Sequence, residues 1–168
     1  MRKRSAGPSE GVSRMRQIRY RGHRPDDLPT LIRLIRTELM PMSHTVSPDD
    51  PAVLAELPDR FDSGRTIVAA PEGGPPLGFV HFGQIHSLLH IDMLVVDPAS
   101  RKHGIGLELM RRAEREGTLG GSLMAVLFVD DVNEKARRFY AREGYEPVRH
   151  FPDLKVTQWT KPLRSEGQ

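Results

Sequence analysis

A glycine-containing junction between a strand and a helix most restricts how this chain can fold. The segment Arg101–Gly106, "RKHGIG", follows the apolar run "IDMLVV" and precedes "LELMRRAEREG", whose apolar residues recur with helical spacing. The first N–H groups of a helix have no partner within the helix, and the helix dipole is positive at that end. The junction therefore predicts an α/β fold with an anion, such as a phosphate, at the start of this helix.

The side chains of the junction also suit a phosphate. Gly104 and Gly106 lack the Cβ atom that would hold a diphosphate away from the backbone. Arg101, Lys102 and His103 can donate charge-assisted hydrogen bonds to it. A helix start with two glycines and a solvated basic run explains the fragment equally well, so the fragment alone leaves both interpretations open.

Two common nucleotide-binding loops fit this junction poorly. A Walker A loop ends in Gly-Lys-Ser/Thr, which is absent here. A dinucleotide-binding fingerprint needs a third glycine where Leu109 stands, although Asp130 or Asp131 could supply its acidic residue. That second interpretation, a nucleotide-binding oxidoreductase, is weakened but stays open.

Hydrophobic periodicity predicts a mixed α/β domain in the order β-α-α-β-β-β-α-β-α-β-β. Expected strands cover residues 17–22, 65–70, 77–86, 88–96, 123–129, 145–151 and 155–163; expected helices cover 25–39, 52–61, 104–116 and 133–142. Pro41 is expected to end the first helix, and Pro58 to break the second. The glycines and prolines of "PEGGPP" predict a hairpin turn between the second and third strands.

Length and charge indicate one domain without a nucleic-acid surface. The 168 residues suit a single domain over residues 16–163, between a disordered basic tail (1–15) and a short C-terminal tail (164–168). Residues 1–24 carry a net charge of +7 against +3 for the whole chain, so the remainder carries −4. Aromatic residues form only 6% of the chain, whereas a nucleic-acid binder needs a basic face with interleaved aromatics.

The absence of cysteine excludes several kinds of chemistry. Disulfides, thiolate metal sites and a cysteine acyl-enzyme all require a residue that this sequence lacks. No apolar run approaches the roughly 20 residues that cross a bilayer, and the basic N-terminus has no apolar segment behind it. We therefore expect a cytoplasmic protein with no membrane association and no metal site.

A second motif, "NEKARRFYAREGY", spans Asn133–Tyr145 and predicts a helix with two distinct faces. The face expected in the core carries Val132, Ala136 and Phe139, and the other face carries Asn133, Arg137 and Tyr140. Gly144 is expected to cap the helix before the next strand. From spacing alone, Tyr140 is either a functional phenol or an amphipathic ring at the rim of the core.

Together these segments resemble a known family. "LVVDPASRKHGIGLELM" followed by "VNEKARRFYAREGY" is similar to the two signature motifs of the GNAT acetyltransferases, in the same order and at similar separation. The resemblance is close over residues 92–145 and looser over about residues 16–163. It implies a GNAT-like fold, in which about four helices flank a central mixed sheet.

The resemblance also implies a co-substrate, acetyl-CoA, and roles for particular residues. Its pyrophosphate would be bound by Arg101, Lys102, His103, Gly104, Ile105 and Gly106, and its pantetheine arm would pair with the backbone of Leu94, Val95 and Val96. Asn133 would hydrogen-bond that arm, and Tyr140 would donate a proton to the departing thiolate. A phenol suits this role because its pKa of about 10 lies near that of an alkyl thiol.

An amine acceptor must lose a proton before it attacks the thioester, so a base is also needed. Asp92 is the first candidate, because some members of the family carry an acidic residue at the similar position. His81, His86 and His90 lie on the expected central strands and are alternatives. Because cysteine is absent, direct attack in a ternary complex is favoured over an acylated enzyme.

The expected acceptor is a primary amine of a small molecule, peptide or protein. The segment from Thr37 to Gly64 contains Glu38, Asp49, Asp50, Glu56, Asp59 and Asp62, but only Arg60 as a base. Such a patch would attract a cationic amine, although a solvated helix face would have the same composition. A homodimer is compatible with the family. A non-catalytic CoA-binding module on the same fold remains the alternative.

Overall fold

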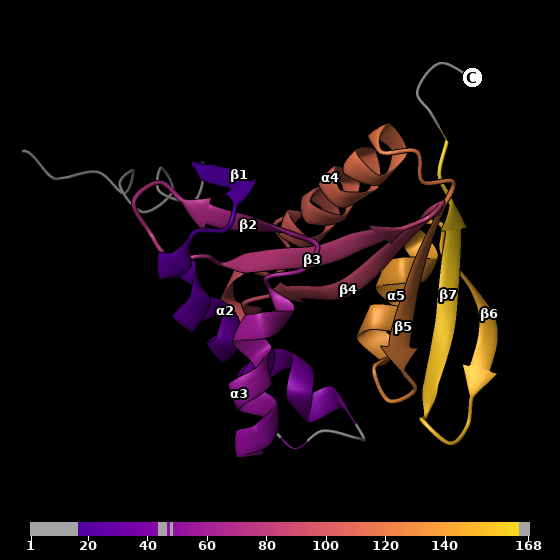
Figure 1. The fold of residues 1–168 in the computed structure, drawn as a ribbon, viewed down its shortest axis with the longest axis horizontal. Helices are drawn as coiled ribbons and strands as arrows, with labels where there is room; N and C mark the ends of the chain where they lie inside the picture. The colour runs from indigo at the N-terminus through magenta and orange to yellow at the C-terminus, as the bar shows by residue number, and fades with distance from the viewer. Residues whose placement is uncertain (1–16, 44–46, 48, 165–168) are drawn as a thin grey trace, which may run out of the picture.

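Seven strands form one sheet in the order β1-β2-β3-β4-β5-β7-β6, and the only parallel pair among the described strands is β4–β5 (Figure 1). The structure is a computed structural model that describes residues 17–43, 47 and 49–164. The strands are β1 (Ile18–Gly22), β2 (Arg65–Pro71), β3 (Gly78–Ile85), β4 (Leu88–Val96), β5 (Met124–Asp130), β6 (Glu146–Phe151) and β7 (Val156–Pro162). The predicted tail 1–15 lies outside the described residues.

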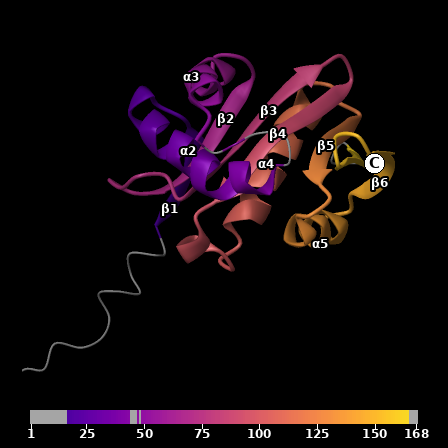
Figure 2. The same ribbon diagram turned by 90° about the horizontal axis from the view of Figure 1, so that it is seen from below.

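The helices pack on the two faces of this sheet. They are α2 (Leu28–Leu34), α3 (Pro51–Arg60), α4 (Ile105–Leu119) and α5 (Glu134–Arg142), with short helical turns η1 (Pro25–Asp27), η2 (Ile35–Leu39), η3 (Met40–Met42) and η4 (Pro98–Ser100). One face carries α4 and α5, and the other carries α2 and α3 over the β2–β4 half of the sheet (Figure 2). The predicted order of elements and the mixed α/β class are confirmed.

Each face of the sheet has its own hydrophobic core. The core under α4 and α5 includes Leu109, Leu127 and Trp159, and the core under α2 and α3 includes Leu31 and Phe79. The described residues contain no helix long and apolar enough to cross a bilayer.

A β-bulge in β4 redirects its side chains between the two cores. His81 of β3 pairs with Met93, but the next residue, Phe82, pairs with Ile91, which leaves Asp92 as the extra residue. Ile91 consequently faces the core under α4, whereas Met93 faces the core under α2.

The sheet opens beside this bulge. The parallel pairing of β4 with β5 is confined to Leu88–His90 opposite Met124–Val126. Beyond these residues the two strands diverge, as Figure 1 shows, and residues 91–96 of β4 have no strand on that side. The edge of β4 is therefore open next to the α4 N-terminus.

Three predicted helix boundaries are wrong. Pro58 does not break α3, because a proline this close to the helix end at Arg60 removes a single intrahelical bond. Pro41 does not stop the first helix directly: the α-helix ends at Leu34, and π-helical and 3-10 turns carry the chain through Pro41. Helix α4 continues to Leu119, past the predicted end at residue 116.

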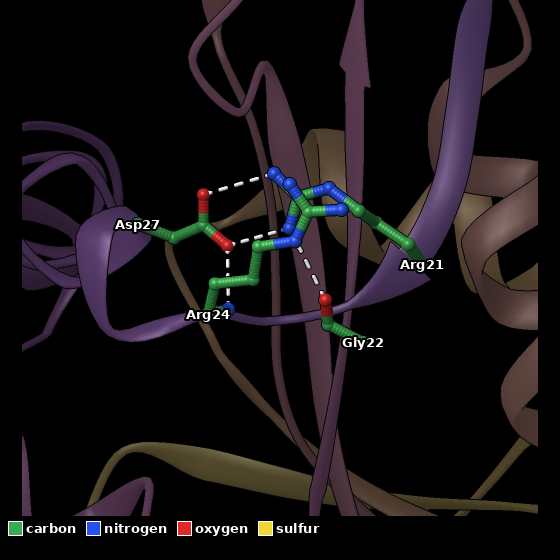
Figure 3. Close-up of polar contacts among 4 residues, drawn as sticks. All are labelled: Arg21, Gly22, Arg24 and Asp27. Carbon is green, nitrogen blue, oxygen red and sulfur yellow. Dashed lines mark hydrogen bonds and ion pairs between the residues drawn. The ribbon is translucent and has the colours of Figure 1, made fainter. Parts of the chain in front are cut away.

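A buried carboxylate fixes the junction between β1 and α2 (Figure 3). Both oxygens of Asp27 accept hydrogen bonds from Arg21, at 2.7 and 3.0 Å, and one also accepts from the backbone N–H of Arg24 at 2.7 Å. The hydrogen bond from Arg21 holds the pKa of Asp27 below its usual range, against the opposing effect of burial. This network sets the angle at which the chain leaves the edge strand.

Candidate active site

The N-terminus of α4 presents unpaired backbone donors at the open edge of β4. The first bond of the helix runs from the N–H of Glu108 to the carbonyl of Gly104 (3.0 Å), so the N–H groups just before Glu108 lack partners within the helix. Gly104 has φ 76°, a left-handed conformation that favours glycine, and Lys102 has φ 68°. The side chains of Lys102 and His103 are exposed. This loop can therefore bind an anion with both backbone and side chains.

Arg101 has a different position from its two neighbours. Its Nε donates to the carbonyl of Val96 (3.2 Å), and its guanidinium pairs with Glu38 of η2 (3.2 Å). The side chain thus ties the loop to the helical segment on the opposite face of the sheet. In this arrangement Lys102 carries the positive charge of the loop that is unpaired among the described residues, and the exposed His103 offers ring nitrogens beside it.

A pocket passes through the opening between β4 and β5. Its volume is about 490 Å³, including its open mouth, and it is lined by Leu39, Met42, Ile91, Asp92, Met93, Leu94, Leu127, Phe128, Val129, Asp130, Asn133, Ala136 and Tyr140. The side chains from α5 approach it from one face of the sheet, and those from η2 and η3 from the other. Two molecules could meet inside it from opposite faces.

Asn133 caps α5 at the edge of this pocket. Its side-chain oxygen accepts the N–H of Ala136 at 3.1 Å, which satisfies one of the free donors of the first turn. With the oxygen engaged, the side-chain NH₂ is the group left to donate a hydrogen bond to a molecule in the pocket. Helix capping thus also orients the amide.

Tyr140 is 9% exposed and lines the same pocket. Its ring packs edge-to-face against Phe139 and Tyr145, with centroids 5.2 and 5.6 Å away. Burial raises the pKa of the Tyr140 phenol above its ordinary value, because a phenolate would lose its hydration. The phenol therefore keeps its proton at neutral pH, but it is a weaker acid than an exposed phenol, so its pKa lies further from that of an alkyl thiol than the sequence predicts.

Asp92, the bulged residue of β4, lines the pocket as well. One of its oxygens accepts a 2.7 Å hydrogen bond from Arg60 at the end of α3. The bulge brings this carboxylate and the phenol of Tyr140 to one pocket although the residues are far apart in sequence.

The histidine alternatives lie elsewhere. His81 is buried beneath α3 and shares a 2.8 Å hydrogen bond with Thr66, and burial lowers its pKa. His86 lies exposed in the turn after β3, with φ 55°. His90 packs edge-to-face against Phe128, with ring centroids 6.1 Å apart. None of the three lines the pocket, so Asp92 is the candidate whose position fits a base.

The family of this chain follows from its sequence. The family model described as "Acetyltransferase (GNAT) family" matches residues 31–145, which include the α4 loop, Asp92 and all of α5. The chain belongs to this family. A probable N-acetyltransferase of Mycobacterium tuberculosis, Rv2775, is 34% identical over 85 residues; these are 49% of this chain and 47% of that protein, so the match spans about half of each.

Solved GNAT-fold structures superpose on nearly the whole described chain. Ard1 from Thermoplasma volcanium is 20% identical with a TM-score of 0.72, over 88% of this chain and 99% of that one. PaiA N-acetyltransferase from Thermoplasma acidophilum, in complex with coenzyme A, is 19% identical with a TM-score of 0.71, over 87% and 99%. At these identities the likeness concerns the fold, and the predicted GNAT-like fold is confirmed.

One side chain of the second GNAT motif departs from the prediction. Val132, expected in the core, is 53% exposed. It precedes the Asn133 cap and therefore lies outside the helix, where helical spacing does not apply. Ala136 and Phe139 do pack against the core, and Gly144, with φ 94°, ends the helix as predicted.

Sequence reasoning missed the pocket residues on the far face of the sheet. Leu39 and Met42 come from the end of the first helical segment, and Phe128 comes from β5. The sequence does contain a signal for Phe128. Its neighbours Leu127 and Val129 belong to the core under α4 and α5, so alternation along the strand places the large apolar ring of Phe128 on the other face.

Proposed function

We propose that this protein is an acetyl-CoA-dependent N-acetyltransferase that acts on a primary amine of a small molecule, peptide or protein. The observation that carries the proposal is the pocket through the split sheet, which Asp92 and Tyr140 both line beside the anion-binding start of α4. Family membership supports it, as do the relative named as a probable N-acetyltransferase and the similar fold crystallised with coenzyme A. The cysteine-free sequence fits a cytoplasmic location.

The residues present fit acetyl-CoA. The backbone from Arg101 to Gly106, with the exposed side chains of Lys102 and His103, would hold the pyrophosphate. The open backbone edge of β4, at Leu94–Val96, would pair with the amides of the pantetheine arm. The side-chain NH₂ of Asn133 would donate to a carbonyl of that arm. Acetyl-CoA supplies the activated acetyl group, and the protein positions it.

In the proposed reaction Asp92 accepts a proton from the ammonium form of the acceptor. The freed amine nitrogen attacks the thioester carbonyl, so that a C–N bond forms and the C–S bond breaks. Tyr140 passes its proton to the sulfur that leaves, and the second proton that the nitrogen loses as the amide forms returns to the Tyr140 oxygen, so the products are the acetamide and the CoA thiol. The phenol is protonated at neutral pH even at its ordinary pKa, and burial, which raises that pKa, makes it a weaker acid, so the transfer to sulfur is uphill unless bound substrate stabilises the phenolate.

Direct transfer in a ternary complex follows from the side chains available. The chain contains no cysteine to carry the acetyl group, and side chains from elements on both faces of the sheet line the pocket. Acetyl-CoA would enter between α4 and α5, and the amine from the face under η2 and η3. Both substrates can therefore be bound at once.

Several carboxylates of the predicted acidic patch already have partners within the protein. Glu38 pairs with Arg101, Asp49 pairs with Arg36, and Asp50 caps α3 through the N–H of Ala52. Among the described residues of this patch, only Glu56, Asp59 and Asp62 have exposed carboxylates that form no hydrogen bond or ion pair. The attraction of this patch for a cationic acceptor is correspondingly smaller.

A thiol-release assay with acetyl-CoA and a panel of primary amines tests the proposal. Release that depends on the amine, with an acetylated product detected by mass spectrometry, supports it. Binding of acetyl-CoA without release across a broad panel would instead favour a non-catalytic CoA-binding module. A thermal-shift comparison of acetyl-CoA with NAD should show stabilisation by acetyl-CoA alone.

A further inference from the structure

An unusual run of aromatic rings extends from the mouth of the pocket. Phe128 lines the pocket, and its ring contacts His90 on one side and Phe151 on the other, each with centroids 6.1 Å apart. The guanidinium of Arg149 lies over Phe151, 4.8 Å from the ring centre. These four side chains come from β4, β5 and β6, and we call them the aromatic platform.

The platform lies on the half of one sheet face that α2 and α3 leave uncovered. Phe128 points away from its neighbours Leu127 and Val129, which belong to the core under α4 and α5. Among the described residues, none from β5, β7 or β6 belongs to the core under α2 and α3. Figure 2 shows α2 and α3 over the other half of the sheet. Phe128 is consequently 49% exposed.

The mouth of the pocket on this face combines apolar side chains with the carboxylate of Asp130, which lies two residues beyond Phe128 on β5. Met42 of η3 also lines the pocket and is 42% exposed, so a flexible thioether and a phenyl ring flank the entrance. A ring that enters beside Phe128 can stack edge-to-face or offset on it, with more apolar area removed from water. An amine reaching Asp92 from this face would place its carbon chain at these two side chains.

The far end of the platform is positively charged. Arg149 is exposed. Among the described residues, its guanidinium lies over the ring of Phe151 and forms no ion pair with a carboxylate. A second ammonium group on the acceptor would therefore approach an unneutralised guanidinium. The platform thus favours an apolar body, and its far end at Arg149 disfavours a second ammonium group that extends along it.

We infer that the acceptor is a primary amine that carries an aromatic ring on a short alkyl chain and no second cationic group. The ring rests on Phe128 while the nitrogen reaches Asp92. This inference rests on the proposed acetyltransferase function and deepens it, because it names the class of amine.

Three amines test the ring and the second cation separately. Phenethylamine carries an aromatic ring, n-butylamine carries an alkyl chain alone, and 1,4-diaminobutane carries a second ammonium group. We expect kcat/KM to be about tenfold higher for phenethylamine than for n-butylamine, and lowest for 1,4-diaminobutane. With phenethylamine as the acceptor, Phe128→Ala should raise the Michaelis constant about 3- to 10-fold, whereas with n-butylamine it should leave that constant unchanged. Phe128→Trp should retain the preference. Arg149→Gln should raise kcat/KM for 1,4-diaminobutane alone.

Leu119→Ala is the matched control, because Leu119 is also a large exposed apolar residue but lies at the C-terminal end of α4. It should change none of these constants. Titration calorimetry of phenethylamine into the protein saturated with coenzyme A gives a second measurement that needs no turnover. Binding that Phe128→Ala weakens, without turnover of any amine, would support the platform and contradict the proposed catalysis.

The opposite results are equally decisive. Turnover without preference for the aromatic amine, or a preference that Phe128→Ala leaves intact, would overturn the platform and leave the acetyltransferase function standing. Absence of both binding and turnover with phenethylamine, while other amines react, would also overturn it. Absence of binding and turnover for all three amines would overturn the platform, whereas the acetyltransferase function is contradicted only by absence of thiol release across the broad amine panel.

Discussion

Arg60, the last residue of α3, donates a 2.7 Å hydrogen bond to Asp92, the bulged residue of β4. The two residues are 32 positions apart, and their ion pair fastens the helix to the sheet at the pocket. The guanidinium occupies a carboxylate oxygen that an acceptor ammonium would also need. A cationic amine can therefore bind Asp92 by replacing Arg60.

Asp92→Asn and Arg60→Gln remove the same ion pair, but only the first removes the carboxylate. If Asp92 accepts the proton of the acceptor, Asp92→Asn should lower kcat about 100-fold, whereas Arg60→Gln should retain most of the turnover. Steady-state kinetics with a saturating amine, together with the Kd of acetyl-CoA, measures the difference. Equal losses in the two variants would mean that the pair matters only for the structure.

Tyr140→Phe should lower kcat about 100-fold without weakening acetyl-CoA binding, because it removes the proton donor and keeps the buried ring. Tyr145→Phe is a matched control: Tyr145 packs against Tyr140, and its buried hydroxyl has no hydrogen-bond partner among the described residues. Its removal should leave turnover unchanged. Full turnover by Tyr140→Phe would show that another group protonates the thiolate.

Gly106→Ala tests the anion site at the start of α4. A Cβ at this position would meet Val96 and Phe139 at 3.7 and 3.8 Å, ordinary contact distances, so the fold should accept it. The methyl group would instead hold the pyrophosphate away from the backbone, and we expect the affinity for acetyl-CoA to fall about tenfold. Calorimetric titration measures the affinity, and the unchanged thermal midpoint of the free protein is the control. Unchanged affinity would place the pyrophosphate elsewhere.

Asp27→Asn should reduce the free energy of unfolding by about 1–3 kcal/mol, because it weakens the two hydrogen bonds that Arg21 donates to the buried carboxylate of Asp27. The control is Asp26→Asn, because Asp26 is exposed and its substitution should change the free energy of unfolding little. Urea unfolding at pH 7 measures both.

The same pair predicts a pH dependence. Arg21 lowers the pKa of Asp27 in the folded state, so the folded protein binds this proton less readily than the unfolded chain, whose aspartates titrate near pH 3.9. The contribution of Asp27 to stability is therefore complete above about pH 5 and is lost as the pH falls through the folded-state pKa. Asp27→Asn should lack this part of the acid sensitivity. An identical acid profile for both proteins would contradict the assignment.

Much of the fold is predictable from local patterns. The order of elements, the glycine junction before α4 and the cap at Gly144 depend on periodicity and backbone preference, which neighbouring residues carry. The errors occur where local rules compete with context. Pro58 lies too near a helix end to break it, and Val132 lies just outside the helix whose spacing was applied to it.

The candidate site divides in the same way. By itself the sequence determined the chemistry available: a glycine loop for an anion, a capping Asn133, a phenol at Tyr140 and no thiol. Only the tertiary structure decided which groups share a pocket, because the bulge at Asp92 and the divergence of β4 from β5 arise from pairing between distant strands. The same pairing left Phe128 exposed at the pocket mouth, since alternation along β5 turned it toward the half of the sheet face that α2 and α3 do not reach.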